Sequence, residues 1–264
     1  MLKILKVYKY QSQLLIQQLG RIRRFYQHKT RFYSSKTGRF KIDQDNPYLL
    51  DSTATTEFDA HYLYHVAWAC RKVKQISPQR HIDISSSLNF CTTVSAFIPT
   101  EFYDYRPAQI NLNNLSCNQM NLLNLTFEAN SIESLSCMHV VEHVGLGRYG
   151  DPIDYNGDLK AVQEISRVVR SNGHLLFVVP VAGTPALEFN AHRIYSYSQI
   201  IQMFAEFDIL EHALVTDQGD FLLNPDLSSY AVQKYGCGCF WFRKKAMQLN
   251  NLSDQNDELT HAQQ

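Results

Sequence analysis

An alternation of short apolar runs with longer segments of helical periodicity constrains the fold of this chain more than any other feature. Residues 175–179 are almost purely apolar, which is typical of a strand buried on both faces of a parallel sheet. Residues 158–169 show helical spacing, and we expect that helix to end at Asn172-Gly173. Strands that alternate with helices in this way predict βαβ units wound into one mostly parallel sheet.

The same alternation extends over most of the chain. Further strands are expected at residues 81–84, 101–104, 110–112, 134–140, 207–215 and 239–243. Further helices are expected at residues 57–75, 88–97 and 198–205. The sequence therefore predicts a doubly wound α/β fold.

Length and composition fit one such domain with an extension at each end. The chain has 264 residues, of which 45% are hydrophobic, and this is enough for one large core. We place the domain at residues 56–245. Residues 1–55 form a basic extension with no acidic residue before Asp43, and residues 246–264 are polar and predicted to be disordered.

The basic N-terminal extension has three interpretations. Its apolar residues, among them Leu2, Leu15 and Leu19, could form one or two amphipathic helical turns. The segment could pack loosely on the domain. It could lie on an anionic membrane surface, because basic residues stand beside an apolar face. It could also act as an organellar transit peptide, because it is Arg-rich and acid-free. The sequence leaves these alternatives open, so peripheral membrane contact is one of the partners to consider.

Charge and cysteine usage predict a cytoplasmic protein. The formal net charge is zero, so we expect no nucleic-acid partner. The six cysteines are scattered through apolar segments, which suits a reduced interior. No apolar run approaches the roughly 18 to 20 residues that span a bilayer, and no signal peptide is visible.

Polar residues follow the first two expected strands. Asp83 is followed by a run of small residues that includes Ser85 and Ser87, and such a turn lets a cofactor approach the backbone closely. Asp104 ends the next strand, where a carboxylate can accept hydrogen bonds from two ribose hydroxyls. Together these positions predict a nucleotide-type site at the carboxyl ends of the strands.

The order of these and later motifs resembles class I S-adenosylmethionine-dependent methyltransferases. Residues 83–87 are similar to the D-x-G-x-G motif, with serine at both glycine positions. Residues 121–135 resemble D-x-x-x-L-P-F…S-F-D-x-V, with Asn121 at the leading acidic position. Val-Glu-His at residues 141–143 and the hairpin sequence at residues 164–175 are also similar to segments of that superfamily.

A longer run narrows the resemblance. Residues 142–152, Glu-His-Val-Gly-Leu-Gly-Arg-Tyr-Gly-Asp-Pro, resemble an uncharacterised methyltransferase-like family whose members often occur near sugar or polysaccharide biosynthesis genes. The resemblance covers about residues 56–245. It implies a Rossmann-like sheet of seven strands with an antiparallel last strand.

The resemblance also implies a cofactor and site roles. S-adenosylmethionine would be bound by Asp83, Ser85, Ser87, Asp104, Asn121 and Glu142. His143 or Asp151 would remove a proton from a small-molecule acceptor, for which we consider a sugar or glycan precursor. The acceptor would be bound by Arg148, Tyr149, His192 and Arg193.

No metal site is predicted. The two histidines and the glutamate of residues 139–143 lie where a strand becomes a loop, which does not hold i and i+4 side chains on one face. His61 and His65 lie one helical turn apart, but no third ligand is evident nearby. Residues 237–239, Cys-Gly-Cys, lack the second cysteine pair that a zinc knuckle needs.

Two functions fit these motifs. The first is methyl transfer to a small acceptor. The second is a catalytically inactive methyltransferase-like binding or scaffold protein, because Ser85, Ser87 and Asn121 depart from the expected motifs. A nucleotide-dependent oxidoreductase fits poorly, since no G-x-G-x-x-G follows the first strand.

Overall fold

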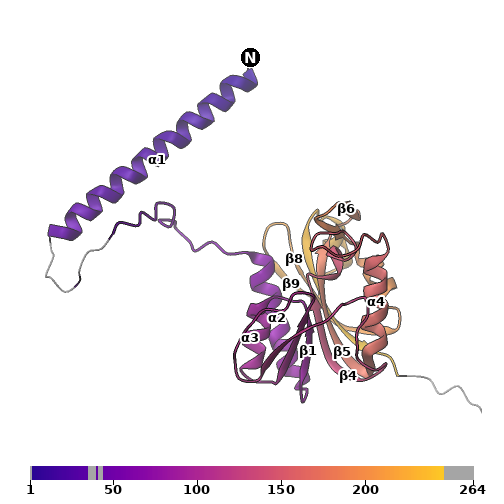
Figure 1. Cartoon of the computed structure of the whole chain (residues 1–264). Helices are drawn as coiled ribbons and strands as arrows, with labels where there is room; N and C mark the ends of the chain where they lie inside the picture. Colours follow the sequence, from indigo (N-terminus) through magenta and orange to yellow (C-terminus); the bar gives the residue numbers. More distant parts are fainter. Residues whose placement is uncertain (1, 35–39, 41–43, 247–264) are drawn as a thin grey trace, which may run out of the picture. The chain divides into compact units, whose positions relative to one another are not determined.

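A computed structural model describes residues 2–34, 40 and 44–246 of the chain (Figure 1). The chain divides into two compact units, Met1–Phe58 and Asp59–Gln264, and each is described by itself. The tail predicted to be disordered, residues 246–264, lies outside the described residues except for its first position.

The first unit contains one long helix, α1 (Leu2–Ser34). The expectation of one or two helical turns was too short, since α1 continues for 33 residues. The segment contains no proline and only Gly20 as a glycine, so little in it interrupts a helix. Among the described residues, no helix combines the length and the apolar character needed to cross a membrane.

The second unit contains a large sheet and its covering helices. The strands of the sheet are β1 (His81–Ile84), β2 (Thr100–Asp104), β3 (Leu115–Gln119), β4 (Ile132–Met138), β5 (Val169–Val181), β8 (Phe207–Val215), β9 (Phe221–Leu223) and β10 (Gly236–Lys244). The helices are α2 (Ala60–Ile76), α3 (Leu88–Ser95), α4 (Gly157–Val168), α5 (Tyr197–Met203) and α6 (Leu227–Ala231), with the short 3-10 helix η1 (Val141–His143). A separate ribbon pairs β6 (Ala186–Glu188) with β7 (His192–Ile194).

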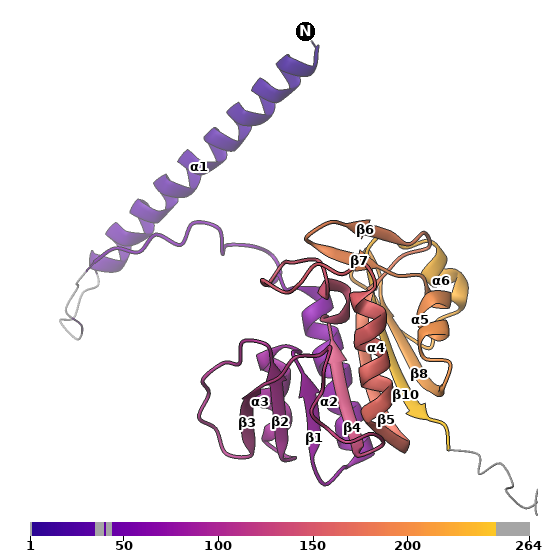
Figure 2. The same ribbon diagram turned by 45° about the vertical axis from the view of Figure 1, so that its right-hand side comes forward.

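The strand order is β3-β2-β1-β4-β5-β10-β8-β9, which Figure 2 shows from left to right as far as β8. The pairs from β3 to β5 are all parallel. Strand β10 is antiparallel to both β5 and β8, so it is inserted in the reverse direction. This order confirms the predicted doubly wound, mostly parallel fold with an antiparallel last strand, although β9 adds an eighth strand at the edge.

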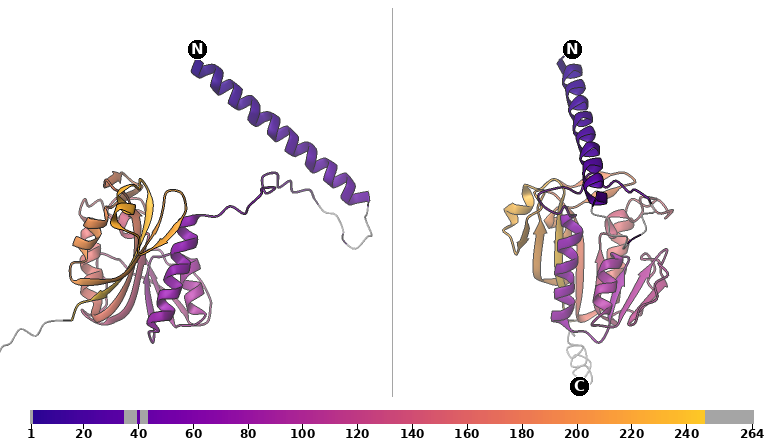
Figure 3. Two further views of the ribbon diagram at one scale, coloured as in Figure 1. Left: turned by 180° about the vertical axis from the view of Figure 1, so that it is seen from behind. Right: turned by 90° about the vertical axis from the view of Figure 1, so that its left-hand side faces the viewer.

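Helices cover both faces of the sheet (Figures 1 and 3). On one face, α2 and α3 bury Trp68 and Phe90 against the sheet. On the other face, α4 and α5 bury Ile165 and Ile200. Because both faces are covered, β5 between its neighbours is almost wholly buried from Leu175 onward, as its apolar sequence predicted.

The direction of the strands decides which residues meet. Strands β1, β2 and β4 are parallel, so their carboxyl ends lie at one edge of the sheet. Since β10 runs the other way, its first residues lie at that same edge, with Gly236 opposite Val181 at the end of β5. The site is therefore built from the ends of parallel strands and the beginning of β10.

Two predicted elements were misplaced. The third strand was expected at residues 110–112, but it is β3, a polar edge strand without an apolar pattern. The helix expected to end at Asn172-Gly173 ends at Val168 instead. Asn172 has a φ of 60°, and the register between β4 and β5 shifts beside it, so this dipeptide forms an irregularity inside β5 rather than a helix end.

Candidate functional site

Two cavities lie along the carboxyl edge of the sheet. The larger has a volume of about 740 Å³ and the smaller about 230 Å³. Both are lined by Ser85, His139, His143 and Tyr149. Because the same four residues line both, the cavities form adjoining parts of one cleft.

Asp83 lies beneath the cleft and not in its wall. Its side chain is fully buried, it accepts a hydrogen bond from the Ser86 N–H at 3.0 Å, and it accepts a second from the Ser136 hydroxyl. Burial raises the pKa of Asp83 to about 6, although these hydrogen bonds work in the opposite direction. In this structure Asp83 therefore positions the serine turn and does not reach a bound cofactor directly.

The serine turn from Ser85 to Ser87 uses its polar groups locally. Ser85 has a φ of 56°, the left-handed conformation that glycine adopts most easily, and its N–H donates to Tyr103 O at 2.8 Å. The Ser86 hydroxyl accepts from the Met138 N–H, and Ser87 caps α3. All three serines line the larger cavity.

The smaller cavity brings together Asp104 and Asn121, the two positions expected to bind a nucleoside. One Asp104 oxygen accepts the Arg106 N–H at 2.7 Å, and Asn121 Oδ1 accepts the Leu123 N–H at 2.9 Å. Each oxygen has a second lone pair, and the other Asp104 oxygen is not used by the turn. These groups can accept hydrogen bonds from ribose hydroxyls and from an adenine amino group.

Glu142 and His143 lie in η1, at the wall of the larger cavity. Glu142 is 1% exposed, and its Oε1 lies 3.0 Å from His139 Nδ1 and 3.8 Å from His143 Nε2. His143 Nδ1 lies 2.7 Å from Ala191 O and 3.2 Å from Arg148 Nη1; because the carbonyl contact is the shorter and a carbonyl oxygen only accepts, we assign the ring proton to Nδ1. Burial lowers the pKa of His143, so the ring is neutral and its Nε2 is free to accept a proton.

Asp151 supports the loop that follows η1. It accepts hydrogen bonds from the N–H groups of Gly145 at 2.8 Å and Tyr149 at 3.1 Å. Burial works to raise the pKa of Asp151, but these backbone donors outweigh it and the pKa is lowered. Of the two predicted bases, the geometry favours His143, because Asp151 is held as an ionised acceptor of the loop.

The predicted acceptor-binding residues divide into two groups. Arg148, Tyr149 and His192 line the larger cavity, and the Arg148 guanidinium lies 5.3 Å from the centre of the Tyr149 ring. Arg193 does not line either cavity. Its guanidinium donates to Val144 O at 2.7 Å and to Tyr155 O at 3.0 Å, so Arg193 is a buried support of the loop and the prediction of a binding role is corrected.

Sequence reasoning missed residues that α2 and β10 bring to the cleft. Asp59, His61 and Tyr62 come from the beginning of α2, and Tyr235 directly precedes β10. Burial lowers the pKa of His61, so its ring is neutral. The reversed direction of the last strand could have indicated Tyr235, because it brings the beginning of β10 to the carboxyl edge of the parallel strands. No sequence signal placed the beginning of α2 there.

His61 also meets two residues that were expected to be unrelated to it. Its ring, the His139 ring and the Cys237 sulfur place one ligand atom each within 4.8 Å of one another. Burial raises the pKa of the Cys237 thiol well above its ordinary value. Burial works to lower the pKa of His139, but the Cys237 sulfur and the Glu142 carboxylate outweigh it and raise that pKa. Among the described residues this is a set of potential metal ligands that sequence reasoning did not find.

Comparison with known families gives a match over residues 96–234 to the family described as "Caenorhabditis protein of unknown function, DUF268". This match spans more than half of the chain. The chain belongs to the DUF268 family. Its matched segment runs from the end of α3 through the cleft loop to the residues just before β10, so most of the DUF268 cleft lies within it. No curated protein matches the sequence.

Solved structures with the same fold are distant in sequence. YcgJ from Bacillus subtilis is 13% identical, with a TM-score of 0.50 over 70% of this chain and 100% of its own. A 1,6-didemethyltoxoflavin-N1-methyltransferase from Burkholderia thailandensis, solved with S-adenosylhomocysteine, is 10% identical, with a TM-score of 0.48 over 69% of this chain and 78% of its own. The N-methyltransferase NodS from Bradyrhizobium japonicum is 11% identical, with a TM-score of 0.48 over 74% of this chain and 99% of its own. At 13% identity, the likeness to YcgJ shows that this DUF268 member has a similar fold, and it shows nothing more.

Proposed function

We propose that this chain is an S-adenosylmethionine-dependent methyltransferase that acts on a small hydroxyl-bearing acceptor, for which a sugar or glycan precursor is our first candidate. The observation that carries the proposal is the adjoining pair of cavities. The smaller contains Asp104 and Asn121, and the larger contains His143, Arg148 and His192. One side of the cleft thus suits a nucleoside and the other suits a polar acceptor.

The residues of the smaller cavity fit the cofactor that we propose. Asp104 would bind the ribose hydroxyls, and Asn121 would accept the adenine amino group without charge assistance. The turn from Ser85 to Ser87 lies between both cavities and would hold the methionine part, with Asp83 fixing the turn from below. When bound, the cofactor supplies an electrophilic methyl group.

His143 supplies the proton acceptor in this proposal. Its Nε2 has no proton, because Nδ1 donates to Ala191 O and the neutral ring carries only one. Nε2 would hold the proton that an acceptor hydroxyl in the larger cavity loses on methylation, and the cofactor would leave as S-adenosylhomocysteine. The buried carboxylate of Glu142, 3.8 Å from Nε2, would stabilise the resulting imidazolium.

Calorimetry with S-adenosylhomocysteine tests the nucleoside assignment. We expect measurable binding to the wild-type chain and an affinity lower by roughly 100-fold in Asp104→Ala, because two hydrogen bonds to a charged acceptor contribute about 1.5 kcal/mol or more each. Asp226→Ala is the control, since Asp226 is exposed and its side chain makes no capping hydrogen bond. Equal affinity in Asp104→Ala and wild type would reject the ribose assignment.

A catalytically inactive binding or scaffold protein is the second candidate function. It is favoured by the left-handed Ser85, where the side chain adds strain that glycine would avoid. Wild-type protein that shows no heat of binding at millimolar S-adenosylhomocysteine would favour this second candidate over the enzyme.

A further inference from the structure

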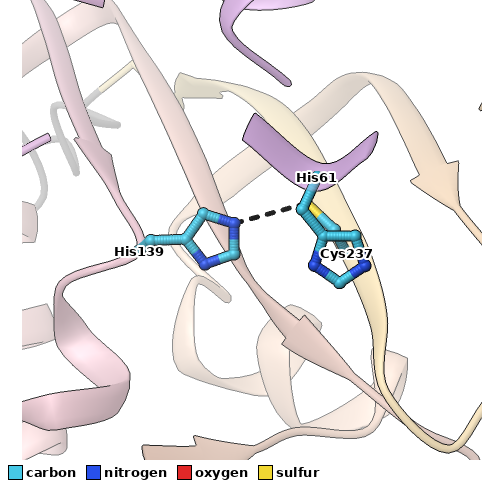
Figure 4. Close-up of side chains that lie close together, drawn as sticks. All are labelled: His61, His139 and Cys237. Carbon is cyan, nitrogen blue, oxygen red and sulfur yellow. Dashed lines mark hydrogen bonds between the residues drawn. The ribbon is translucent and has the colours of Figure 1, made fainter. Parts of the chain in front are cut away.

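A histidine-rich corner of the larger cavity carries an inference that the proposed function does not require. Three elements distant in sequence meet there. His61 lies in the first turn of α2, His139 directly follows β4, and Cys237 is the second residue of β10. Figure 4 shows the His139 ring directed toward Cys237 beside His61.

One pair of these three side chains already has the spacing of two ligands on one metal ion. His139 Nε2 lies 3.5 Å from Cys237 Sγ, and one ligand atom of each of the three residues lies within 4.8 Å of the others. Ordinary zinc–sulfur and zinc–nitrogen bond lengths place sulfur and nitrogen about 3.6 Å apart on a tetrahedron. The contact between Cys237 and His139 therefore already has the separation that a bound zinc ion would impose.

Glu142 orients one of the three ligands. Its Oε1 lies 3.0 Å from His139 Nδ1, so Nδ1 keeps a proton and Nε2, on the side of Cys237, is the atom that would give up its proton and bind a metal. A carboxylate that holds the far nitrogen of a histidine is a usual second partner of metal sites. His139 has a φ of 58°, an uncommon backbone conformation for histidine that positions this ring.

Unpartnered polar atoms surround the three ligands. Glu142 Oε2 and His65 Nε2 are buried without a hydrogen-bond partner among the described residues. The ring centre of His65 lies 5.0 Å from that of His139. Buried charges need compensation. A divalent cation bound beside these atoms would supply the partner that they lack, and Cys237 would bind it as a thiolate after releasing its proton.

We propose that His61, His139 and Cys237 bind a divalent transition metal of the zinc class. Two imidazoles and one thiolate are the nitrogen and sulfur donors that zinc prefers over calcium or magnesium. Three protein ligands leave a fourth position, which is the pattern of catalytic zinc sites rather than structural ones. His61 and His139 line the larger cavity, so an oxygen of the acceptor or a water would occupy that position.

Metal binding can be tested on tag-free, full-length protein stripped with a chelator. Cobalt(II) added alone should give thiolate-to-cobalt charge-transfer absorption and intense visible bands at one equivalent per chain. Zinc(II) should remove these bands, and its affinity is measured by competition with a chromophoric chelator. X-ray absorption of the zinc-loaded wild type should show a first shell with one sulfur, which needs no variant.

Variants separate the cluster from other thiols and histidines. Cys237→Ser and His61→Ala should each lower zinc affinity at least 100-fold, and Glu142→Gln should lower it by about 10- to 100-fold. Cys137→Ser is the matched control, because Cys137 is an equally buried strand thiol outside the cluster and should leave affinity unchanged. Absence of cobalt absorption in the wild type, a first shell without sulfur, or a band that survives Cys237→Ser would overturn the proposal.

The same samples keep this proposal separate from the methyltransferase proposal. Cys237 does not line the smaller cavity, so Cys237→Ser should bind S-adenosylhomocysteine as the wild type does. Zinc binding without S-adenosylhomocysteine binding would support the metal site and reject the proposed enzyme. The reverse result would reject the metal site alone.

Discussion

Asp83 and His81 are buried on the same strand and share one partner. The Ser136 hydroxyl donates to Asp83 and lies 2.9 Å from His81 Nε2. Burial raises the pKa of Asp83 to about 6 and lowers that of His81 to about 3. Both groups therefore resist becoming charged in the folded protein, and they change its stability in opposite directions as pH rises.

Asp83 should make the protein less stable as pH rises from about 4 to about 6. In this window the folded state keeps a proton that the unfolded state, with a pKa of about 3.9, has already lost. The full loss across both pKa values amounts to about 3 kcal/mol, of which about 2 kcal/mol falls between pH 4.5 and pH 7. The free energy of unfolding in urea, measured for wild type and Asp83→Asn at pH 4.5 and pH 7, tests this loss. His81 is present in both proteins, so its own contribution cancels in the difference between them.

The difference in unfolding free energy should shift in favour of Asp83→Asn between these two pH values. The part of the difference in unfolding free energy that is the same at both pH values reflects the hydrogen bonds changed by the substitution, and it does not affect this comparison. A difference that is the same at both values would show that Asp83 titrates normally in the folded state.

His143 should be needed for turnover but not for cofactor binding. With S-adenosylmethionine and an accepted substrate, His143→Gln should lower kcat by about 100-fold or more, because the acceptor loses its base. Its affinity for S-adenosylhomocysteine should stay close to that of the wild type. His212→Gln is the control, since His212 is a half-buried histidine bonded to Tyr230 and lines neither cavity.

The wild-type rate should also report the lowered pKa of His143. Because that pKa lies below its ordinary value, the base stays unprotonated at neutral pH and kcat should fall only in acid. A kcat unchanged in His143→Gln would remove His143 from the mechanism.

At the scale of elements, the loop after η1 depends on one glycine. A Cβ on Gly145 would lie 2.1 Å from Asp154 O, and Gly145 has a φ of 80°. Gly150 has a φ of 82°, but a Cβ there would meet nothing within 4 Å. The two positions share the backbone conformation and differ in the available space.

Gly145→Ala should therefore destabilise the protein by more than Gly150→Ala. The left-handed conformation alone costs about 1 to 2 kcal/mol for a residue with a side chain. Gly145→Ala adds a clash with backbone and should also reduce activity, because His143 lies two residues away. Thermal unfolding of both variants measures the difference, and equal losses would mean that the loop moves to accept the new side chain.

Elements were predictable where their signal is local. The apolar run of β5 and the helical periodicity of α4 follow from a few neighbouring residues, and the mostly parallel sheet follows from the alternation of such strands and helices. The edge strand β3 was misplaced because an exposed polar strand has no apolar pattern. Asn172-Gly173 was misread because the same residues suit a helix end and a strand irregularity.

The site was predictable only in part, because some of its residues are placed by chain order and others by long-range packing. Asp104 and Asn121 follow strands in chain order, so the βαβ rule placed them at one edge. The positions of His61 and Cys237 in the site depend on where β10 inserts and on how α2 packs, and these contacts join residues more than 75 positions apart. Arg193 was misassigned because a buried arginine that binds carbonyl groups has the same sequence signature as one that binds a ligand.

At the scale of the whole chain, α1 belongs to the first unit, Met1–Phe58, and the helix itself has basic residues and no acidic ones. Leu15, Ile16 and Leu19 are exposed on it. We propose that α1 contacts anionic membrane surfaces, because exposed apolar and basic side chains on one helix suit such a surface.

Vesicle sedimentation tests this contact with the full chain. Vesicles containing phosphatidylserine should bind the wild type, and added salt should weaken the binding. Replacing Arg21, Arg23 and Arg24 together with Glu should lower binding by more than 100-fold, since each basic residue near the surface contributes about 1 kcal/mol. Equal binding to uncharged vesicles would contradict an electrostatic contact.

The central claim is that the cleft binds an adenosyl group at the smaller cavity and an acceptor at the larger one. A crystal structure of the full chain soaked with S-adenosylhomocysteine tests this claim most directly. We predict both ribose hydroxyls within hydrogen-bond distance of Asp104, and the sulfur facing the cavity of His143. An adenosyl group bound elsewhere, or electron density that leaves the cavity beside Asp104 without ligand at saturating concentration, would contradict it.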